Sequence, residues 1–172
     1  MTDTCLKPIA LILLDVDGVL TTGQVIYNDE GQETKVFHVR DGLGIRMLME
    51  AGIQVGIVTG RRSTALVHRC RNLGLTLLKD GVRDKAAALE EILEETGTTA
   101  AATAFVGDDL PDLPIMRRVG VPIAVGDAHD LVKQAAAIIT REKGGRGAVR
   151  EISERILKAR GDWEPLLDRL FP

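Results

Sequence analysis

Carboxylates follow two apolar runs of the sequence, at positions that suit a divalent cation. Asp15 and Asp17 come directly after the run Ile9–Leu14, and Asp108 follows the run Ala104–Val106 after one glycine. Unit charges about 4 Å apart repel by roughly 4 kcal/mol at an effective permittivity of about 20, so this cluster is costly without a cation. Oxygen ligands with no His or Cys nearby favour Mg²⁺ over zinc. The pattern therefore predicts a magnesium site.

Further polar residues at expected strand ends and helix starts suit a phosphate group beside that ion. Thr59 can donate through its hydroxyl, Gly60 allows close backbone approach, and Lys85 supplies a positive charge for phosphate oxygens. Asp15 is then a candidate nucleophile that forms an aspartyl-phosphate. Asp17 is placed to protonate the leaving alkoxide and then to deprotonate water. Because monoester hydrolysis is so slow without catalysis, a phosphatase is expected to need this full set of groups.

The elements that must position these residues alternate between strand and helix patterns. Apolar residues at helical spacing form stripes that begin at Ile45, Leu66, Leu89 and Val149. The alternation predicts an α/β fold with an open, Rossmann-like parallel sheet and helices on both faces, and such sheets bind ligands beyond the carboxyl ends of their strands. Continuous apolar runs predict strands covered on both faces, at Ile9–Leu14, Ile53–Val58, Ala104–Val106, Val121–Val125 and Ala137–Ile139.

Capping residues predict where several helices begin and end. Ser63 precedes the second stripe and Asp84 precedes the third, and both are typical N-cap residues. Gly74 is a typical stop after the second helix. Asp41 is expected to cap the first helix in the same way.

One segment breaks the alternation and predicts an inserted β-hairpin over about residues 22–39. Gln24–Tyr27 and Lys35–Val39 flank the polar turn Asn28–Gln32. Apolar side chains fall on both faces of these arms, so an isolated hairpin would be adhesive. The hairpin is therefore expected to cover something or to pair with another copy. With no internal repeat or low-complexity linker, residues 1–172 are interpreted as one domain.

Composition excludes several classes of protein. Hydrophobic residues make up 45% of the 172, which argues against a disordered chain. The net charge of −3 gives no general attraction to nucleic acid. The run Ile9–Leu14 is too short to span a membrane, and no secretory signal pattern opens the chain. Cys5 and Cys70 form neither a disulfide framework nor a metal pair, so a cytoplasmic protein is expected.

Four motifs together resemble those of the haloacid dehalogenase superfamily of phosphatases. The motifs are Asp15–Thr21, Thr59–Arg61, Lys85 and Gly107–Asp112, and their order and spacing match across almost the whole chain. The resemblance implies that Asp15 is the nucleophile and Asp17 the acid and base. It also implies a set of magnesium-site residues, in which Asp15, the Asp17 backbone carbonyl and Asp108 are ligands and Asp109 and Asp112 support them.

A narrower resemblance is to the 3-deoxy-D-manno-octulosonate 8-phosphate (KDO 8-phosphate) phosphatases. It is carried by Val36–Arg46, Asp127–His129 and Gly144–Glu151, with a departure at His38, where the family usually has Asn. The resemblance implies a fold without a cap domain and a homotetramer assembled by the hairpins, in which neighbouring subunits close each active site. It also implies a role in lipopolysaccharide sugar synthesis in a Gram-negative bacterium.

Three arginines are candidate contacts for the sugar acid. Arg40 and Arg62 lie near the predicted helix starts that follow the hairpin and the Thr59 strand, and each could face substrate or solvent. Arg146 lies in a glycine-rich segment and could reach a substrate carboxylate in a neighbouring subunit, or the segment could be a flexible entry to the last helix.

Other functions remain open at this point. A phosphatase for nonulosonate 9-phosphates, the sialic-acid relatives, would use the same chemistry. A phospho-acceptor receiver domain also clusters aspartates, Thr and Lys on an α/β sheet, but there the adjacent acid pair follows the first strand. Here the first strand is followed by Asp15 and Asp17, spaced by one residue, and the adjacent pair Asp108 and Asp109 comes late. An inactive scaffold is disfavoured because every residue needed for turnover is present.

Overall fold

A six-stranded parallel sheet forms the centre of the computed structural model, which describes residues 3–171. The strand order is β5-β4-β1-β6-β7-β8, which confirms the predicted open parallel α/β sheet. The strands are β1 (Leu11–Leu14), β4 (Gln54–Val58), β5 (Leu77–Lys79), β6 (Thr103–Gly107), β7 (Val121–Ala124) and β8 (Ile138–Ile139). The short strand β5 was not among the five predicted, because three residues carry too little pattern to stand out.

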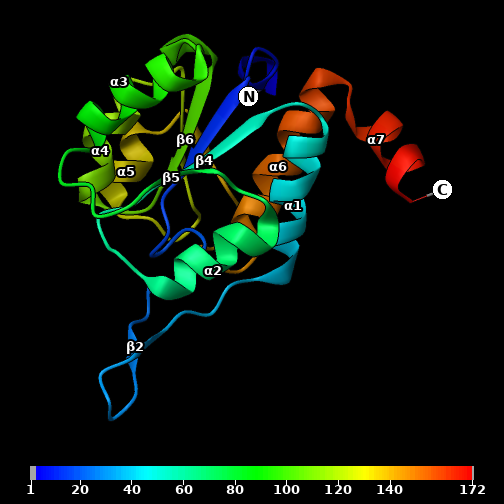
Figure 1. Cartoon of the computed structure of the whole chain (residues 1–172). Helices are drawn as coiled ribbons and strands as arrows, with labels where there is room; N and C mark the ends of the chain where they lie inside the picture. Colours follow the sequence, from blue (N-terminus) through cyan, green and yellow to red (C-terminus); the bar gives the residue numbers. More distant parts are fainter. Residues whose placement is uncertain (1–2, 172) are drawn as a thin grey trace.

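Helices cover both faces of this sheet (Figure 1). One face carries α1 and α6, and the other carries α3, α4 and α5. The α-helices are α1 (Val39–Glu50), α2 (Thr64–Leu73), α3 (Lys85–Thr96), α4 (Leu113–Met116), α5 (Asp130–Ala135), α6 (Ala148–Arg160) and α7 (Trp163–Leu170). Short 3₁₀ helices η1 (Asp3–Leu6), η2 (Ala100–Ala102) and η3 (Leu110–Asp112) complete them. No helix of residues 3–171 combines the length and apolar character that crossing a membrane requires.

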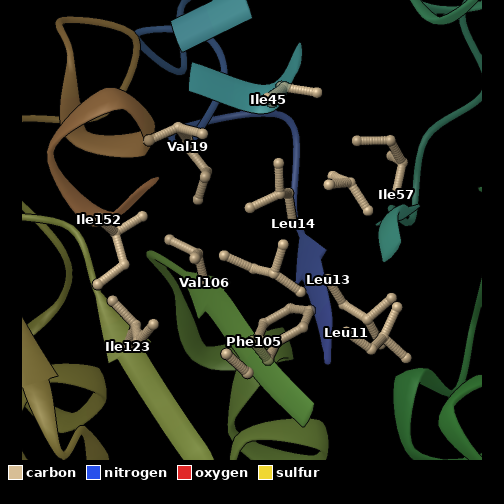
Figure 2. Close-up of a cluster of buried hydrophobic side chains, with 14 of the residues drawn as sticks. Leu11, Leu13, Leu14, Val19, Ile45, Ile57, Phe105, Val106, Ile123 and Ile152 are labelled. Atoms are coloured by element: carbon tan, nitrogen blue, oxygen red, sulfur yellow. The ribbon is translucent and has the colours of Figure 1, made fainter. Parts of the chain in front are cut away.

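The hydrophobic core lies around β1, which is a central strand of the sheet, between β4 and β6. Figure 2 shows Leu14 and Val106 on neighbouring strands, with Ile45 of α1 and Ile152 of α6 on the same side. All four side chains are buried, and each contributes about 1.5–3 kcal/mol by leaving water. Leu14 is paired with Ile57 of β4 and with Val106 of β6. This register brings the carboxyl ends of three motif-bearing strands to one edge of the sheet.

The predicted caps are confirmed at two helices and wrong at a third. Ser63 is the N-cap of α2, and Asp84 caps α3 by accepting the N–H groups of Ala86 (2.9 Å) and Ala87 (3.1 Å). The N-cap of α1 is His38 rather than Asp41. Because helix α1 begins earlier than expected, Asp41 lies within its first turn and its side chain is directed to another helix.

The hairpin is present, but its second arm differs from the prediction. Strands β2 (Ile26–Tyr27) and β3 (Glu33–Thr34) pair antiparallel, and the hairpin extends away from the sheet (Figure 1). The expected arm Lys35–Val39 is not a strand. Lys35 instead turns toward Asp17, and Val39 is already the first residue of α1. An ion pair and a helix start therefore override the β-propensity of this segment.

Candidate active site

Three carboxylates meet at the carboxyl edge of the sheet. Asp15 follows β1, Asp108 follows β6, and Asp112 ends η3 one turn later. Oxygen atoms of these three side chains all lie within 4.8 Å of one another. The juxtaposition follows from the parallel pairing of β1 with β6, which places the residues after Leu14 and after Gly107 side by side.

Lys85 enters this carboxylate cluster from the first turn of α3. Its Nζ lies 3.0 Å from an oxygen of Asp15 and 2.6 Å from an oxygen of Asp112, and only 6% of its side chain is exposed. Burial lowers the pKa of Lys85, but the charges of Asp15 and Asp112 raise it more, so the net shift is upward. The lysine is therefore held charged beside the carboxylate predicted to be the nucleophile.

The cluster carries more negative charge than one lysine can balance. Burial raises the pKa of Asp15 to about 6, with Lys85 opposing and Asp112 adding to the rise. Burial and the charges of Asp15, Asp112 and Asp109 raise the pKa of Asp108 to about 8. The Oδ1 atom of Asp108 is buried and has no hydrogen-bond partner among the described residues. An unpartnered oxygen facing two further carboxylates is a fitting environment for a hard divalent cation such as Mg²⁺.

Asp112 also organises the loop that carries Asp108. Its Oδ2 atom accepts the backbone N–H groups of Asp108 (2.9 Å) and Asp109 (3.3 Å). Its Oδ1 atom accepts a hydrogen bond from Nζ of Lys85. Asp112 thus joins the carboxylate cluster directly, beyond the supporting role that the sequence suggested, whereas the Asp109 side chain is exposed at the start of η3.

Asp17 is held by residues to which the sequence analysis assigned no separate role. Its Oδ1 atom pairs with Nζ of Lys35, and its Oδ2 atom lies 3.6 Å from Nε of Arg61. Glu33 of the hairpin bridges both cations, at 3.2 Å from Lys35 and 3.0 Å from Arg61. Lys35 was hidden within an apparent strand arm, so no local signal marked it. The hairpin therefore contacts the predicted acid and base directly.

The remaining predicted phosphate and substrate residues occupy two different environments. Thr59 is buried at the end of β4, beside β1, and Gly60 follows it at the same edge of the sheet as Asp15. The side chain of Arg62 is 81% exposed and lies 3.8 Å from Asp80. Arg40 and Arg146 line a groove of about 660 Å³ along α6, a groove whose lining includes none of the carboxylate cluster. Within one chain, the structure does not bring these three arginines to the cluster.

Gly18 leaves room for the carboxylate of Asp108. A Cβ atom at Gly18 would lie 2.0 Å from Asp108 Oδ2, and the residue has a φ of +94°, which a side chain disfavours. We expect Gly18→Ala to displace Asp108, to weaken Mg²⁺ binding about 10- to 100-fold and to lower turnover in parallel. Titration calorimetry with Mg²⁺ tests this. Gly31→Ala is the matched control, because Gly31 also has a positive φ (+74°) but nothing lies within 4 Å of its Cβ position. Unchanged Mg²⁺ affinity in Gly18→Ala would contradict it.

The fold and the cluster together define a class of protein. A parallel sheet with carboxylates and a lysine at its carboxyl edge is suited to metal-assisted phosphoryl transfer. A family model described as haloacid dehalogenase-like hydrolase matches residues 75–152. The class is thus that of the haloacid dehalogenase-like hydrolases, in its small form without a cap domain.

Individual relatives narrow the class. The 3-deoxy-D-manno-octulosonate 8-phosphate phosphatase of Yersinia pestis is 43% identical over 94% of this chain and 92% of its own length. The crystal structure of the Moraxella catarrhalis enzyme, in complex with a magnesium ion, a phosphate ion and a KDO molecule, is 40% identical with a TM-score of 0.94, over 97% of this chain and 96% of that one. The cobalt-bound structure of the Haemophilus influenzae enzyme is 45% identical with a TM-score of 0.90, and the match covers 92% of this chain and 93% of that one. This chain belongs to the KDO 8-phosphate phosphatase family.

Proposed function

We propose that the chain hydrolyses KDO 8-phosphate to KDO and phosphate, with Mg²⁺ as its cofactor, in lipopolysaccharide synthesis. The cluster of Asp15, Asp108, Asp112 and Lys85 at the sheet edge carries this proposal. It places a carboxylate nucleophile, a cation and a set of oxygen ligands together at one edge of the sheet. Family membership supports the choice of the eight-carbon sugar acid, since the relatives named above act on or bind that compound.

In this proposal two aspartates share the chemistry. An oxygen of Asp15 attacks phosphorus, an aspartyl-phosphate bond forms, and the bond from phosphorus to the sugar oxygen breaks. Asp17 gives its proton to the departing alkoxide and then takes a proton from the water that cleaves the aspartyl-phosphate. Lys85 holds Asp15 in place and offers its charge to the phosphoryl oxygens, and the Thr59 hydroxyl and the Gly60 backbone donate to them.

The residues that would hold Mg²⁺ are the carboxylates of Asp15 and Asp108 and the backbone carbonyl of Asp17. Asp112 supports them through the N–H of Asp108 and offers a further oxygen in the same cluster. An ion bound there would neutralise negative charge on the phosphoryl group during its transfer. The unpartnered Oδ1 of Asp108 supports this assignment.

A comparison of two substrates tests the proposal. We expect kcat/KM for KDO 8-phosphate to exceed that for a nonulosonate 9-phosphate by at least about 100-fold, because an extra carbon and misplaced hydroxyls leave polar groups of a fitted site unpaired. Phosphate release with Mg²⁺ is the measurement. The reverse preference would support the nine-carbon alternative. Stable labelling of Asp15 by acetyl phosphate without turnover would instead support a receiver domain.

We also propose that the active enzyme is a homotetramer assembled through the hairpin, in the cytoplasm. A two-stranded hairpin is marginally stable alone, and this one exposes a set of apolar side chains that we call the hairpin patch: Val25, Ile26, Tyr27 and Val36. Burial against other copies would cover the hairpin patch. Neighbouring subunits would then supply residues such as Arg146 to the sugar acid, while Arg40 and Arg62 stay candidates for the same role.

A charge in the hairpin patch should dissociate the assembly. We expect Ile26→Asp combined with Val36→Asp to shift the protein to a monomer in sedimentation velocity, because two carboxylates cannot be buried unpaired at an interface. Turnover should fall as well if neighbours close the site. Leu131→Asp, on an exposed residue of α5, is the matched control. A double variant that still sediments as a tetramer would contradict the role of the hairpin.

A further inference from the structure

The loop Gly144–Gly147 contacts the backbone of Gly18 and Val19, shortly after Asp15, and two carboxylates hold the loop by hydrogen bonds. We infer that Asp127 and Asp41 are positioning residues: through this loop they fix the spacing between the two segments that carry the metal-binding carboxylates. The inference deepens the proposed function, because it rests on Asp15 and Asp108 being the residues that hold Mg²⁺.

The loop contacts the segment after Asp15 backbone to backbone. A Cβ atom at Gly144 would lie 1.6 Å from the carbonyl oxygen of Gly18, so only glycine allows this approach. The N–H of Gly145 donates to the carbonyl of Val19 at 2.8 Å. A displacement of the loop therefore moves the backbone of the Asp15–Gly18 segment, with no flexible side chain between them to absorb it.

Asp127 connects the same loop to the other metal-binding segment. Its Oδ1 atom accepts the N–H of Gly144 at 2.9 Å. Two residues along, the N–H of His129 donates to the carbonyl of Asp108 at 2.8 Å. The short Asp127–His129 segment thus contacts Asp108 at one end and the glycine loop at the other. This makes a further connection between Asp108 and the segment after Asp15, separate from the pairing of β1 with β6 and from the Lys85–Asp112 contacts.

Asp41 holds the far end of the loop. It is 1% exposed, and its two oxygens accept the N–H groups of Gly147 (3.2 Å) and Arg150 (2.8 Å) at the start of α6. Helix α1 reaches α6 closely because Gly44 faces Ser153, where a Cβ would lie 2.9 Å from the serine hydroxyl. The carboxylate that the sequence suggested as a cap for its own helix therefore caps the neighbouring one.

The spacing matters because Mg²⁺ demands near-octahedral oxygens at about 2.0–2.1 Å. A loop that relaxes by a few tenths of an ångström spoils that geometry while leaving the hydrophobic core intact. Partners of this kind, one step away from the ligands, typically change metal affinity about 10- to 100-fold. The positioning role therefore predicts a loss of Mg²⁺ affinity and of kcat that exceeds any loss of stability.

Asp127 offers the sharper test, because it is exposed and its replacement leaves the core untouched. We expect Asp127→Ala to raise the Kd for Mg²⁺, measured by titration calorimetry without substrate, by about 10-fold or more. Asp127→Asn keeps an oxygen that accepts the Gly144 N–H, so it should stay within about 3-fold of the wild type. Asp41→Asn, which loses one of two acceptors, should fall between them. In turnover assays kcat should fall in the same order, with KM changed less.

Glu154→Ala is the matched control. It removes a carboxylate of α6 that pairs with Arg150 and Lys158 but does not touch the loop. The positioning role is wrong if Asp127→Ala binds Mg²⁺ as tightly as the wild type, or if Glu154→Ala loses as much Mg²⁺ affinity as Asp127→Ala. It is also wrong if the wild type binds no Mg²⁺. A wild type that binds Mg²⁺ tightly but fails to hydrolyse KDO 8-phosphate overturns the proposed substrate and leaves the positioning role standing, because the calorimetric comparison uses no substrate.

Discussion

We expect Asp15→Asn to lower phosphate release from KDO 8-phosphate by at least about 10⁴-fold, which is the scale of loss when a covalent nucleophile is removed. The amide oxygen is too weak a nucleophile to attack phosphorus, and every other group of the proposed mechanism remains in place. The fold should not suffer. The pKa of Asp15 is raised, chiefly by burial, which means that the deprotonated carboxylate lowers the stability of the folded chain. A neutral isostere therefore leaves the melting temperature unchanged or raises it.

The measurement pairs a phosphate-release assay with thermal melts of the same samples. Asp130→Asn is the control, because Asp130 is an exposed acid in the first turn of α5, outside the carboxylate cluster. Activity of Asp15→Asn within about 10-fold of the wild type would exclude Asp15 as the nucleophile. An inactive variant with a much lower melting temperature would indicate a structural role instead.

We expect the metal-free protein to lose stability as the pH rises, and Mg²⁺ to restore that stability. The pKa of Asp108 is raised from 3.8 to about 8 and that of Asp15 from 3.8 to about 6, chiefly by burial. A carboxyl group with a raised pKa in the folded state contributes stability that is full below pH 3.8 and is lost as the pH rises through the folded-state value. Between about pH 4 and pH 8 the stability of the metal-free chain should therefore fall.

Mg²⁺ acts in the opposite direction, because it binds the deprotonated carboxylates. Its affinity should increase with pH up to about 8, and its binding should release protons. At about 100 times its Kd, a ligand specific for the folded state adds about 2.7 kcal/mol, which corresponds to roughly 5–11 °C for a chain of this length.

Melting temperatures from pH 5 to pH 8.5, with EDTA or with Mg²⁺, measure both effects. Asp108→Asn should remove most of the pH dependence and most of the stabilisation by Mg²⁺. A stability profile that does not change with pH in EDTA would contradict the electrostatic account of the carboxylate cluster.

The chemistry of this protein was largely predictable from local sequence. Strand ends are marked by apolar runs that stop, and Asp15, Thr59 and Asp108 each follow such a run. In a parallel sheet these ends lie at one edge, so the meeting of Asp15 with Asp108 followed from the order of elements alone. Helix caps such as Ser63 and Asp84 were predictable for the same reason, because a cap depends on a few consecutive residues.

Only the tertiary structure decided which side chains, far away in the sequence, hold the residues of the site and the helix starts in place. Lys35 pairs with Asp17 eighteen positions away, and Asp41 caps a helix more than one hundred positions away. Asp127 likewise reaches Gly144 from a separate loop. Such contacts depend on how helices pack against the sheet, and packing is set by the sum of many weak side-chain interactions rather than by a local pattern. The sequence alone thus determined which carboxylates meet at the carboxyl edge of the sheet, whereas the residues that hold them in place were decided by close packing between segments far apart in the chain.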